Sequence, residues 1–316
     1  MHNNLQTKHP VILIFGGNGW IGSKVVRLLL NLNTDNNDFI TVIKSSCRAD
    51  ELNKIQDEIN SIGNVTHIMS FIGRTHGTYN NEVIGTIDYL EKPGKLVDNM
   101  RDNLFSPIGL AELSKKNNIH FTYLGTGCIF EYDEAHVFGN ESTGFVELDL
   151  PNFIGSSYSI VKGYTDRLMH ELYNDSALNA RIRMPITDEL DSSRNFITKI
   201  TSYKKVCSIP NSMTVLDDLL PVLIDMALTR KVGTVNLTNP GIISHNEILS
   251  MYKEIVDPNF TWENFSIEEQ NQILASKRSN NCLDTTLLSS WYTILPIKES
   301  VRFTLLRMKE KEELKE

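Results

Sequence analysis

The first half of the chain alternates short apolar runs with amphipathic segments. Val11–Phe15 is a continuous apolar run, which is typical of a strand buried on both faces of a parallel sheet. Residues 20–32 then carry apolar side chains at helical spacing. The alternation continues, and it predicts strands at 39–43, 65–72, 119–124 and 180–184 and helices at 49–61, 95–117 and 157–173. This order predicts an α/β fold with a doubly wound parallel sheet of the Rossmann type.

Two segments depart from this pattern. Residues 74–94 are rich in Gly, Asn and Thr and have weak periodicity, so we expect a long loop or insertion there. Pro107 falls inside the helix predicted at 95–117. It should kink this helix, because proline lacks an N–H group and clashes with the preceding turn.

The pattern becomes shorter and more irregular after Pro185. Asn, Ser and Pro cluster at 191–195 and 208–212, and an amphipathic helix is expected over Leu216–Leu228. A chain of 316 residues has room for about two domains. We therefore predict a Rossmann domain over residues 1–183, with residues 211–238 packing back on it, and a smaller substrate-binding domain made of residues 184–210 and 239–316.

Charge and composition exclude several classes of function. The chain has 31 Lys and Arg against 39 Asp and Glu, a net charge of −8, so we expect no binding to nucleic acid or to anionic membranes. No apolar run approaches the ~20 residues that span a bilayer, and residues 1–9 lack the apolar core of a signal peptide. We therefore expect a cytoplasmic protein. Its four cysteines have neither CxxC spacing nor a zinc pattern, so we expect free thiols and no metal site.

A glycine-rich turn joins the first predicted strand to the first predicted helix. Its spacing is Gly16-x-x-Gly19-x-x-Gly22. Glycines let backbone N–H groups approach a pyrophosphate, and the helix N-terminus adds partial positive charge. A purely structural turn is the alternative, but this context favours a dinucleotide site. We expect cofactor contacts from this turn and from three later positions: Gly16, Asn18, Gly19, Trp20, Ile21, Gly22, Ile72, Gly73 and Met184.

The end of the second predicted strand indicates which dinucleotide binds. An acidic residue there would bond the ribose 2′-hydroxyl of NAD. The stretch Lys44–Arg48 instead carries cations and two serines, with no acid before Asp50. A cation and hydroxyls suit a 2′-phosphate, so we predict NADPH, with Arg48 as its contact. The alternative is that Arg48 is an ordinary solvated loop cation.

A tyrosine and a lysine share one face of the helix predicted at 157–173. Tyr158 and Lys162 are four residues apart. The Lys162 ammonium would favour the phenolate of Tyr158, whose ordinary pKa is about 10, and so bring it closer to acid–base work near neutral pH. Thr126 ends the preceding strand and can bond the same substrate carbonyl. A solvated helix face is the alternative, but together with the glycine turn these residues favour a reductase in which Tyr158 and Lys162 also contact the cofactor.

These residues resemble the extended branch of the short-chain dehydrogenase/reductase superfamily. The glycine turn, Thr126, Tyr158 and Lys162 all match its pattern. One stretch departs from it, since the usual Asn-Ala-Ala-Gly after a central strand reads Ser-Phe-Ile-Gly over residues 70–73.

Cys128 points to a closer family. It lies two residues beyond Thr126, so strand alternation aims both side chains toward one cleft. A thiolate beside a carbonyl can abstract the acidic proton on an adjacent carbon, although a buried cysteine is more often a packing residue. Distinctive stretches follow in order at Gly125–Asp133, Arg183–Ile186, Arg194–Ile200, Ile209–Thr214, Thr238–Gly241, Ser244–Ile248 and Arg278–Asn281. They look like those of the bifunctional nucleotide-4-keto-6-deoxyglucose 3,5-epimerase/4-reductases that complete UDP-L-rhamnose synthesis.

This resemblance, which covers nearly the whole chain, implies a division of labour. Cys128 and Lys199 would form the epimerase acid/base pair, while Thr126, Tyr158 and Lys162 would serve reduction by NADPH. The second domain would hold the nucleotide sugar, with Cys128, Asn195, Lys199 and Arg278 as contacts. The substrate, UDP-4-keto-6-deoxyglucose, would come from a separate 4,6-dehydratase, and a homodimer is the expected assembly. Residues 74–102 depart from the family, so no contact is carried over from them.

Other functions remain open from the sequence alone. One is a monofunctional nucleotide-4-keto-sugar reductase, against which Cys128 and Lys199 argue. Another is a non-catalytic, NADPH-binding regulatory subunit, against which the intact Thr126, Tyr158 and Lys162 argue. Guanosine-sugar epimerase-reductases pair the thiol with a histidine, and no histidine lies between residues 171 and 244. The choice of UDP or dTDP, and which of Cys128 and Lys199 is the base, also stay open.

Overall fold

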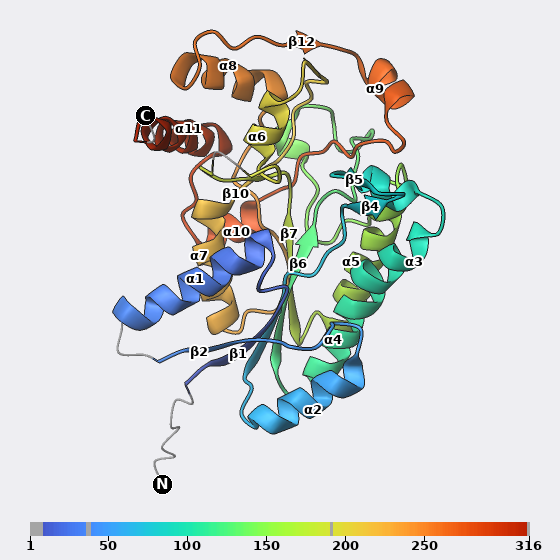
Figure 1. Ribbon diagram of the computed structural model, residues 1–316, viewed down its shortest axis with the longest axis vertical. Helices are drawn as coiled ribbons and strands as arrows, with labels where there is room; N and C mark the ends of the chain where they lie inside the picture. Colours follow the sequence, from blue (N-terminus) through green and yellow to red (C-terminus); the bar gives the residue numbers. More distant parts are fainter. Residues whose placement is uncertain (1–8, 36–38, 190–191, 315–316) are drawn as a thin grey trace.

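Six parallel strands form the centre of the molecule (Figure 1). The computed structural model describes residues 9–35, 39–189 and 192–314. The strands are β1 (Val11–Phe15), β2 (Thr41–Lys44), β3 (His67–Ser70), β6 (His120–Thr126), β7 (Ala177–Ile182) and β11 (Gly233–Asn236), in the spatial order β11-β7-β6-β3-β1-β2. The predicted doubly wound parallel sheet is therefore confirmed. Its order reverses at β1, which pairs with β2 on one side and β3 on the other, and ligands bind at such a switch point.

Helices cover both faces of the sheet. One face packs against α1 (Trp20–Asp35), α7 (Leu216–Leu228) and α10 (Thr286–Trp291), and the other against α2 (Leu52–Ile62), α4 (Ser106–Lys116) and α5 (Ser157–Tyr173). Strand β1 shows why its sequence is apolar throughout. Ile12 and Ile14 enter the first core, whereas Leu13 and Phe15 enter the second. The expected helices at 157–173 and 216–228 are confirmed with the same bounds.

The helix expected at 95–117 is interrupted. It consists of α3 (Lys95–Met100), a π-helical turn η2 (Arg101–Phe105) and α4, so the irregularity precedes Pro107. Pro107 has no N–H to offer the carbonyl of Asn103, four residues earlier. The Thr165 hydroxyl of α5 donates to that carbonyl instead, at 2.6 Å. This bond joins the interrupted helix to the helix that carries Tyr158.

The long loop expected at 74–94 was partly wrong. The segment contains a hairpin of β4 (Gly77–Tyr79) and β5 (Glu82–Ile84), followed by a 3-10 helix η1 (Ile87–Glu91). Asn80 and Asn81 form its turn with φ angles of 49° and 65°, as a primed hairpin turn requires. Strands of three residues are too short to show alternation, so the sequence pattern could not reveal them.

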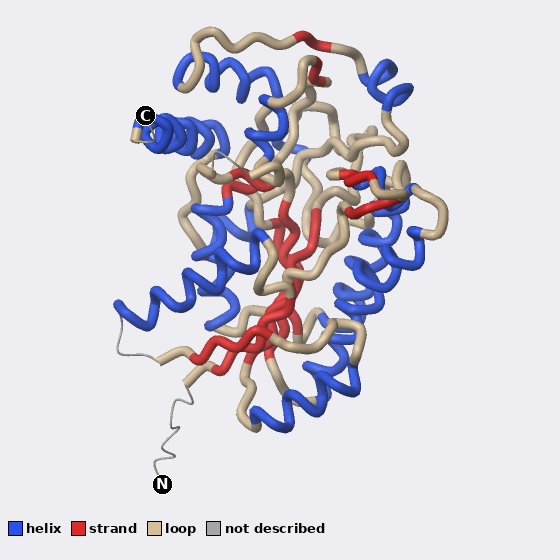
Figure 2. Tube along the Cα trace, in the orientation of Figure 1, coloured by secondary structure: helices blue, strands red, loops and turns tan. Residues whose placement is uncertain are grey.

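A second group of elements lies beyond the carboxyl ends of the central strands and is richer in loops (Figures 1 and 2). Its helices are α6 (Phe196–Thr201), α8 (His245–Ile255), α9 (Ile267–Ile273) and α11 (Ile297–Glu313), with a short turn η3 at Glu141–Thr143. Its strand pairs are β8 (Pro185–Ile186) with β10 (Thr214–Val215) and β9 (Lys205–Val206) with β12 (Glu263–Asn264). Residues such as Ile197, Leu249 and Val301 form a core of their own. Among the described residues, no helix combines the length and apolar character needed to cross a bilayer.

Two buried histidines lie side by side in the sheet. His67 of β3 and His120 of β6 contact edge to face, with ring centroids 5.6 Å apart. Burial and the neighbouring His120 lower the pKa of His67 to about 4, below its ordinary value of 6.5. Because the unfolded chain then binds more protons, His67 stabilises the fold above pH 6.5, and this contribution is lost as the pH falls toward 4.

We therefore expect His67→Phe, which keeps a ring against His120, to flatten the pH dependence of stability. Between pH 7 and pH 5 the unaltered protein should lose about 2 kcal/mol more of its free energy of unfolding than the variant does. Urea denaturation at both pH values measures this difference. Equal losses in the two proteins would contradict the assignment.

Candidate active site

The glycine turn stands at the carboxyl end of β1, where α1 begins. Gly16 has a φ of 75°, and the Gly19 N–H donates to the Gly16 carbonyl at 2.9 Å. A Cβ added to Gly22 would lie 2.2 Å from that same carbonyl oxygen, so a side chain is excluded there. The cradle therefore fits a pyrophosphate held by backbone N–H groups at a helix N-terminus. Within it, Asn18 accepts a hydrogen bond of 2.9 Å from Lys44 at the end of β2.

Neighbouring segments close around this turn. A Cβ on Gly16 would lie 3.1 Å from the backbone of Phe71, so the segment that holds Ile72 and Gly73 borders the turn. Trp20 donates from its indole N–H to Glu189 at 2.7 Å, and Lys24 forms an ion pair with the same carboxylate. Of the other expected contacts, Ile21 packs on the sheet's core and Met184, with a φ of 38°, ends the segment after β7.

The loop after β2 differs in part from the prediction. The hydroxyls of Ser45 and Ser46 donate to Glu58 of α2 at 2.5 and 3.0 Å, so this carboxylate already occupies both. Arg48 remains outward, with 57% of its side chain exposed, and pairs with Asp50 at 3.1 Å. We expected Arg48 and the two serine hydroxyls to bind the 2′-phosphate of the cofactor together. For the hydroxyls this expectation is wrong, because both donate to Glu58.

Three arginines gather at this edge of the sheet around one carboxylate. Asp102 lies 2.5 Å from Arg74, 2.9 Å from Arg101 and 3.9 Å from Arg48. Its side chain is only 10% exposed. Asp50 also pairs with Arg48, and Asp98 also pairs with Arg101, so three carboxylates face the three arginines at this edge. Sequence reasoning missed Arg74 and Asp102, since their approach to Arg48 depends on the interrupted helix.

The predicted reductase residues meet at the end of β6 and the start of α5. The Thr126 hydroxyl accepts from the Cys128 backbone N–H at 3.0 Å and also bonds the Tyr158 side chain. Burial and the nearby Cys128 raise the pKa of Tyr158 well above its ordinary value. The expected lowering by Lys162 is therefore wrong. Tyr158 keeps its proton at neutral pH, which suits a proton donor.

Lys162 has a different partner from the expected one. Its ammonium donates to the Tyr123 hydroxyl and lies 4.5 Å from the centre of the Tyr123 ring. Lys162 is 4% exposed, and burial lowers its pKa to about 8, opposed by Asp166 and Cys128. Tyr123 was missed because its side chain reaches Lys162 across the contact between β6 and α5, which no local pattern records.

Lys199 belongs to a second cluster of charges. It lies on α6, and burial together with Arg278 lowers its pKa, while Asp88 opposes this. Arg278 makes two hydrogen bonds to the Asp88 carboxylate, at 3.1 and 3.0 Å. Within the described chain, Lys199 and Cys128 form no hydrogen bond with each other. Lys199 lies on α6, whereas Cys128 lies in the turn after β6, which ends at Thr126, so the expected strand alternation does not extend to Cys128.

Asn195, expected to contact substrate, has no free polar group in its side chain. It is fully buried, and its amide donates to the carbonyls of Thr187 and Glu189 and accepts from the Thr187 N–H. These bonds fix the segment before α6. Because the buried amide is already bonded to the protein backbone, the structure contradicts the expected contact between Asn195 and the substrate. Among the described residues, no group of three His, Cys, Asp or Glu side chains is arranged to hold a metal.

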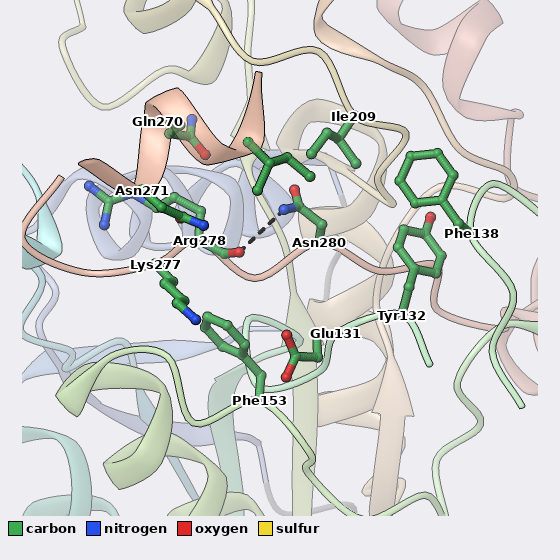
Figure 3. A pocket seen from close by; sticks show the side chains of 11 residues that line it. Glu131, Tyr132, Phe138, Phe153, Ile209, Gln270, Asn271, Lys277, Arg278 and Asn280 are labelled. Carbon is green, nitrogen blue, oxygen red and sulfur yellow. Dashed lines mark hydrogen bonds between the residues drawn. The ribbon is translucent and has the colours of Figure 1, made fainter. Parts of the chain in front are cut away.

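A pocket of about 280 Å³ adjoins the second cluster (Figure 3). Its polar lining comes from α9 and the strand-like segment after it, including Gln270, Asn271, Lys277 and Arg278, and its aromatic lining includes Phe153. The Asn280 amide donates to the Arg278 carbonyl at 3.2 Å and stiffens this wall. The pocket shares Arg278 with the charge cluster but contains none of the predicted catalytic residues.

Comparison with known proteins places the chain among nucleotide-sugar enzymes. It is 52% identical over 298 residues to protein L780 of Acanthamoeba polyphaga mimivirus, covering 94% of this chain and 98% of L780. The crystal structure of L780, described as a UDP-rhamnose synthase, superposes with a TM-score of 0.87 over 95% of this chain and all of that one, at 51% identity. The chain is also 40% identical, over 96% of its length and 95% of the relative, to a bifunctional dTDP-4-dehydrorhamnose 3,5-epimerase/reductase of Arabidopsis thaliana.

A trifunctional protein of Arabidopsis thaliana, UDP-glucose 4,6-dehydratase/UDP-4-keto-6-deoxy-D-glucose 3,5-epimerase/UDP-4-keto-L-rhamnose-reductase, is 41% identical. The match covers 92% of this chain but 41% of that protein. A model of the NAD dependent epimerase/dehydratase family matches residues 12–198. On this match, and on a relative that shares half of its residues over nearly its whole length, the chain belongs to the NAD dependent epimerase/dehydratase family.

Proposed function

We propose that the chain converts UDP-4-keto-6-deoxy-D-glucose to UDP-L-rhamnose, by epimerisation at C3 and C5 and reduction at C4. One observation carries this proposal: Cys128 is held at the Thr126–Tyr158 pair. Its backbone N–H donates to the Thr126 hydroxyl, and its thiol is near enough to Tyr158 to raise the pKa of that phenol. The names of L780 and of the Arabidopsis relatives support the same reaction class. The UDP form is the one named for L780, the relative with the higher identity.

The chemistry follows from a single carbonyl. The 4-keto group acidifies the protons at C3 and C5, and each is removed on one face and replaced on the other by Cys128 and Lys199. Thr126 and the protonated Tyr158 bond the carbonyl oxygen, and Tyr158 then delivers its proton to it. When bound, the nicotinamide cofactor supplies the hydride for C4. The glycine turn holds its pyrophosphate, and Lys162, one turn after Tyr158 on α5, is a further contact of the cofactor.

The cofactor is a nicotinamide dinucleotide, and we propose that it is NADPH. The group of arginines around Asp102 supports this choice, because Arg48 keeps 57% of its side chain exposed and β2 ends in Lys44 and not in an acid. Arg48 is the outermost of them and carries the selectivity.

Assembly and supply form a further part of the proposal. Residues 1–183 and 211–238, together with α10, form the NADP-binding domain, and the rest of 184–210 and 239–316 forms the nucleotide-sugar domain. A second copy of the chain covers exposed apolar side chains on the neighbouring elements α3, η2 and α5, which are Leu96, Val97, Met100, Phe105, Ile160 and Tyr164. We propose that a separate 4,6-dehydratase supplies the substrate, an activity that the name of the trifunctional relative includes. The four free cysteines suit a cytoplasmic setting.

Product analysis tests the function directly. The protein, incubated with NADPH and UDP-4-keto-6-deoxyglucose, should release UDP-L-rhamnose, identified by NMR. A product reduced at C4 without inversion at C3 and C5 would leave only a monofunctional reductase. No turnover at all would leave a binding protein.

The cofactor proposal predicts that Arg48→Ala narrows the preference for NADPH over NADH. A charge-assisted hydrogen bond contributes roughly 1.5–3 kcal/mol, so NADPH affinity should fall on the order of tenfold or more while NADH affinity is kept. Fluorescence titration with both cofactors measures the change, and Lys54→Ala, an exposed cation of the next helix paired with Glu51, is the matched control. Equal affinities in the unaltered protein would exclude a 2′-phosphate site.

The two half-reactions should separate by mutation. Cys128→Ser replaces a readily ionised thiol by a far weaker base, so incorporation of solvent deuterium at C3 and C5 should collapse while NADPH binding survives. Lys199→Ala should behave in the same way. Unchanged exchange in a folded, substrate-binding Cys128→Ser protein would make Cys128 a packing residue.

The converse is expected for the reductase residues. Tyr158→Phe should leave deuterium exchange in place but slow hydride transfer by about 10²–10⁴, since the carbonyl loses its positioned proton donor. Lys162→Ala should likewise keep deuterium exchange and slow hydride transfer, and it should also weaken cofactor binding. Single-turnover measurement of NADPH oxidation, beside NMR of the exchanged sugar, separates the two steps. Loss of both steps in Tyr158→Phe would show that the two chemistries do not divide between these residues.

A further inference from the structure

The 3-10 helix η1, in the segment for which the sequence offered no role, joins two parts of the active site. Its Glu91 carboxylate accepts the Ser157 backbone N–H at 2.8 Å, at the start of the helix that carries Tyr158. Tyr89 and Leu90 anchor it, since they are 3% and 2% exposed. Three residues before Glu91, Asp88 faces the other way and reaches Arg278. A segment fixed at both ends in this manner is a structural wall and not a loose loop.

Asp88 and Ser276 hold the guanidinium of Arg278 in one orientation. Its Nη1 donates to Asp88 at 3.1 Å and its Nη2 donates to Asp88 at 3.0 Å, so the carboxylate lies across the end of the planar group. The Nη1 also donates to the Ser276 carbonyl at 3.0 Å and to its hydroxyl at 2.6 Å. The Ser276 hydroxyl in turn donates to Asp88 at 2.7 Å. Three groups thus fix the plane and the direction of the guanidinium.

This arrangement leaves one edge of Arg278 free. A guanidinium has five N–H donors, and Asp88 and Ser276 take those on its end and on the Nη1 side. The Nε–H and the second Nη2–H, which lie parallel on the opposite edge, have no partner among the described residues. Such a parallel pair matches two oxygens of a phosphate group. The free edge lies in the same charge cluster as Lys199.

We propose that Asp88 is a positioning residue, which orients Arg278 so that its free Nε/Nη2 edge binds the diphosphate of the nucleotide sugar. The inference rests on the proposed function and adds to it the group that sets substrate orientation. Charge alone predicts the opposite role, because a carboxylate near a diphosphate repels it. Neutralising the carboxylate should therefore lower the affinity for the diphosphate if Asp88 orients Arg278, and raise it if Asp88 acts only through its charge.

Calorimetric titration with UDP and with uridine distinguishes these cases. In Asp88→Asn, UDP affinity should fall roughly tenfold or more, since Arg278 loses its fixed direction, while uridine and NADPH affinities stay unchanged. Glu82→Gln is the matched control, because Glu82 is an exposed carboxylate on β5, the strand that precedes η1. It should leave UDP affinity unchanged. In turnover, Asp88→Asn should raise KM for the nucleotide sugar far more than it lowers kcat.

A double variant tests whether Asp88 acts through Arg278. Arg278→Lys keeps the charge but cannot form the fork, and Asp88→Asn should cost little further UDP affinity in that background. UDP affinity that is equal or higher in Asp88→Asn, or an equal fall for UDP and uridine, would overturn the inference and leave the proposed function standing. An unaltered protein that binds NADPH but no UDP would overturn the proposed function and this inference with it. Unchanged NADPH binding in each variant shows that the fold is intact.

Discussion

The close contact between Gly16 and Gly22 is the constraint on which the cofactor site depends. Helix α1 can begin directly over the end of β1 only because no side chain stands between these residues. The N–H groups of the first turn then converge on one point, where a diphosphate gains most from them. All six strands of the central sheet run parallel, so their carboxyl ends meet at this same edge. Thr126 and Arg48 reach it from β6 and from the loop after β2.

Helix α5 transmits this arrangement to the catalytic residues. It is tied to the sheet by Asp166, which binds Arg181 of β7 at 2.9 and 2.7 Å in full burial. One turn earlier, Lys162 contacts Tyr123 of β6. A buried ion pair adds little net stability but strongly disfavours any packing that separates it. The two contacts therefore set the rotation and height of α5, and with them the place of Tyr158.

Local patterns revealed most of the fold and about half of the site. The bounds of α5 and α7 and the glycine turn were predictable, because spacing, capping and strand–turn–helix order are written in neighbouring residues. Partnerships across the chain were not. Asp88 meets Arg278 190 positions away, and Lys162 meets Tyr123 39 positions away. The serine hydroxyls that were expected to bind a phosphate instead donate to Glu58, because this residue of α2 points toward the loop after β2.

Epimerisation and reduction make opposite demands on protons, and the site meets them with burial. Reduction needs an acid that still holds its proton at neutral pH, and burial beside Cys128 raises the pKa of Tyr158. Burial and the Arg278 charge lower the pKa of Lys199, which is proposed to exchange protons with the sugar in epimerisation. The same loss of water acts in opposite directions because a phenol is charged when deprotonated and an amine when protonated. Burial alone therefore favours the neutral form of both the Tyr158 phenol and the Lys199 amine at a single pH.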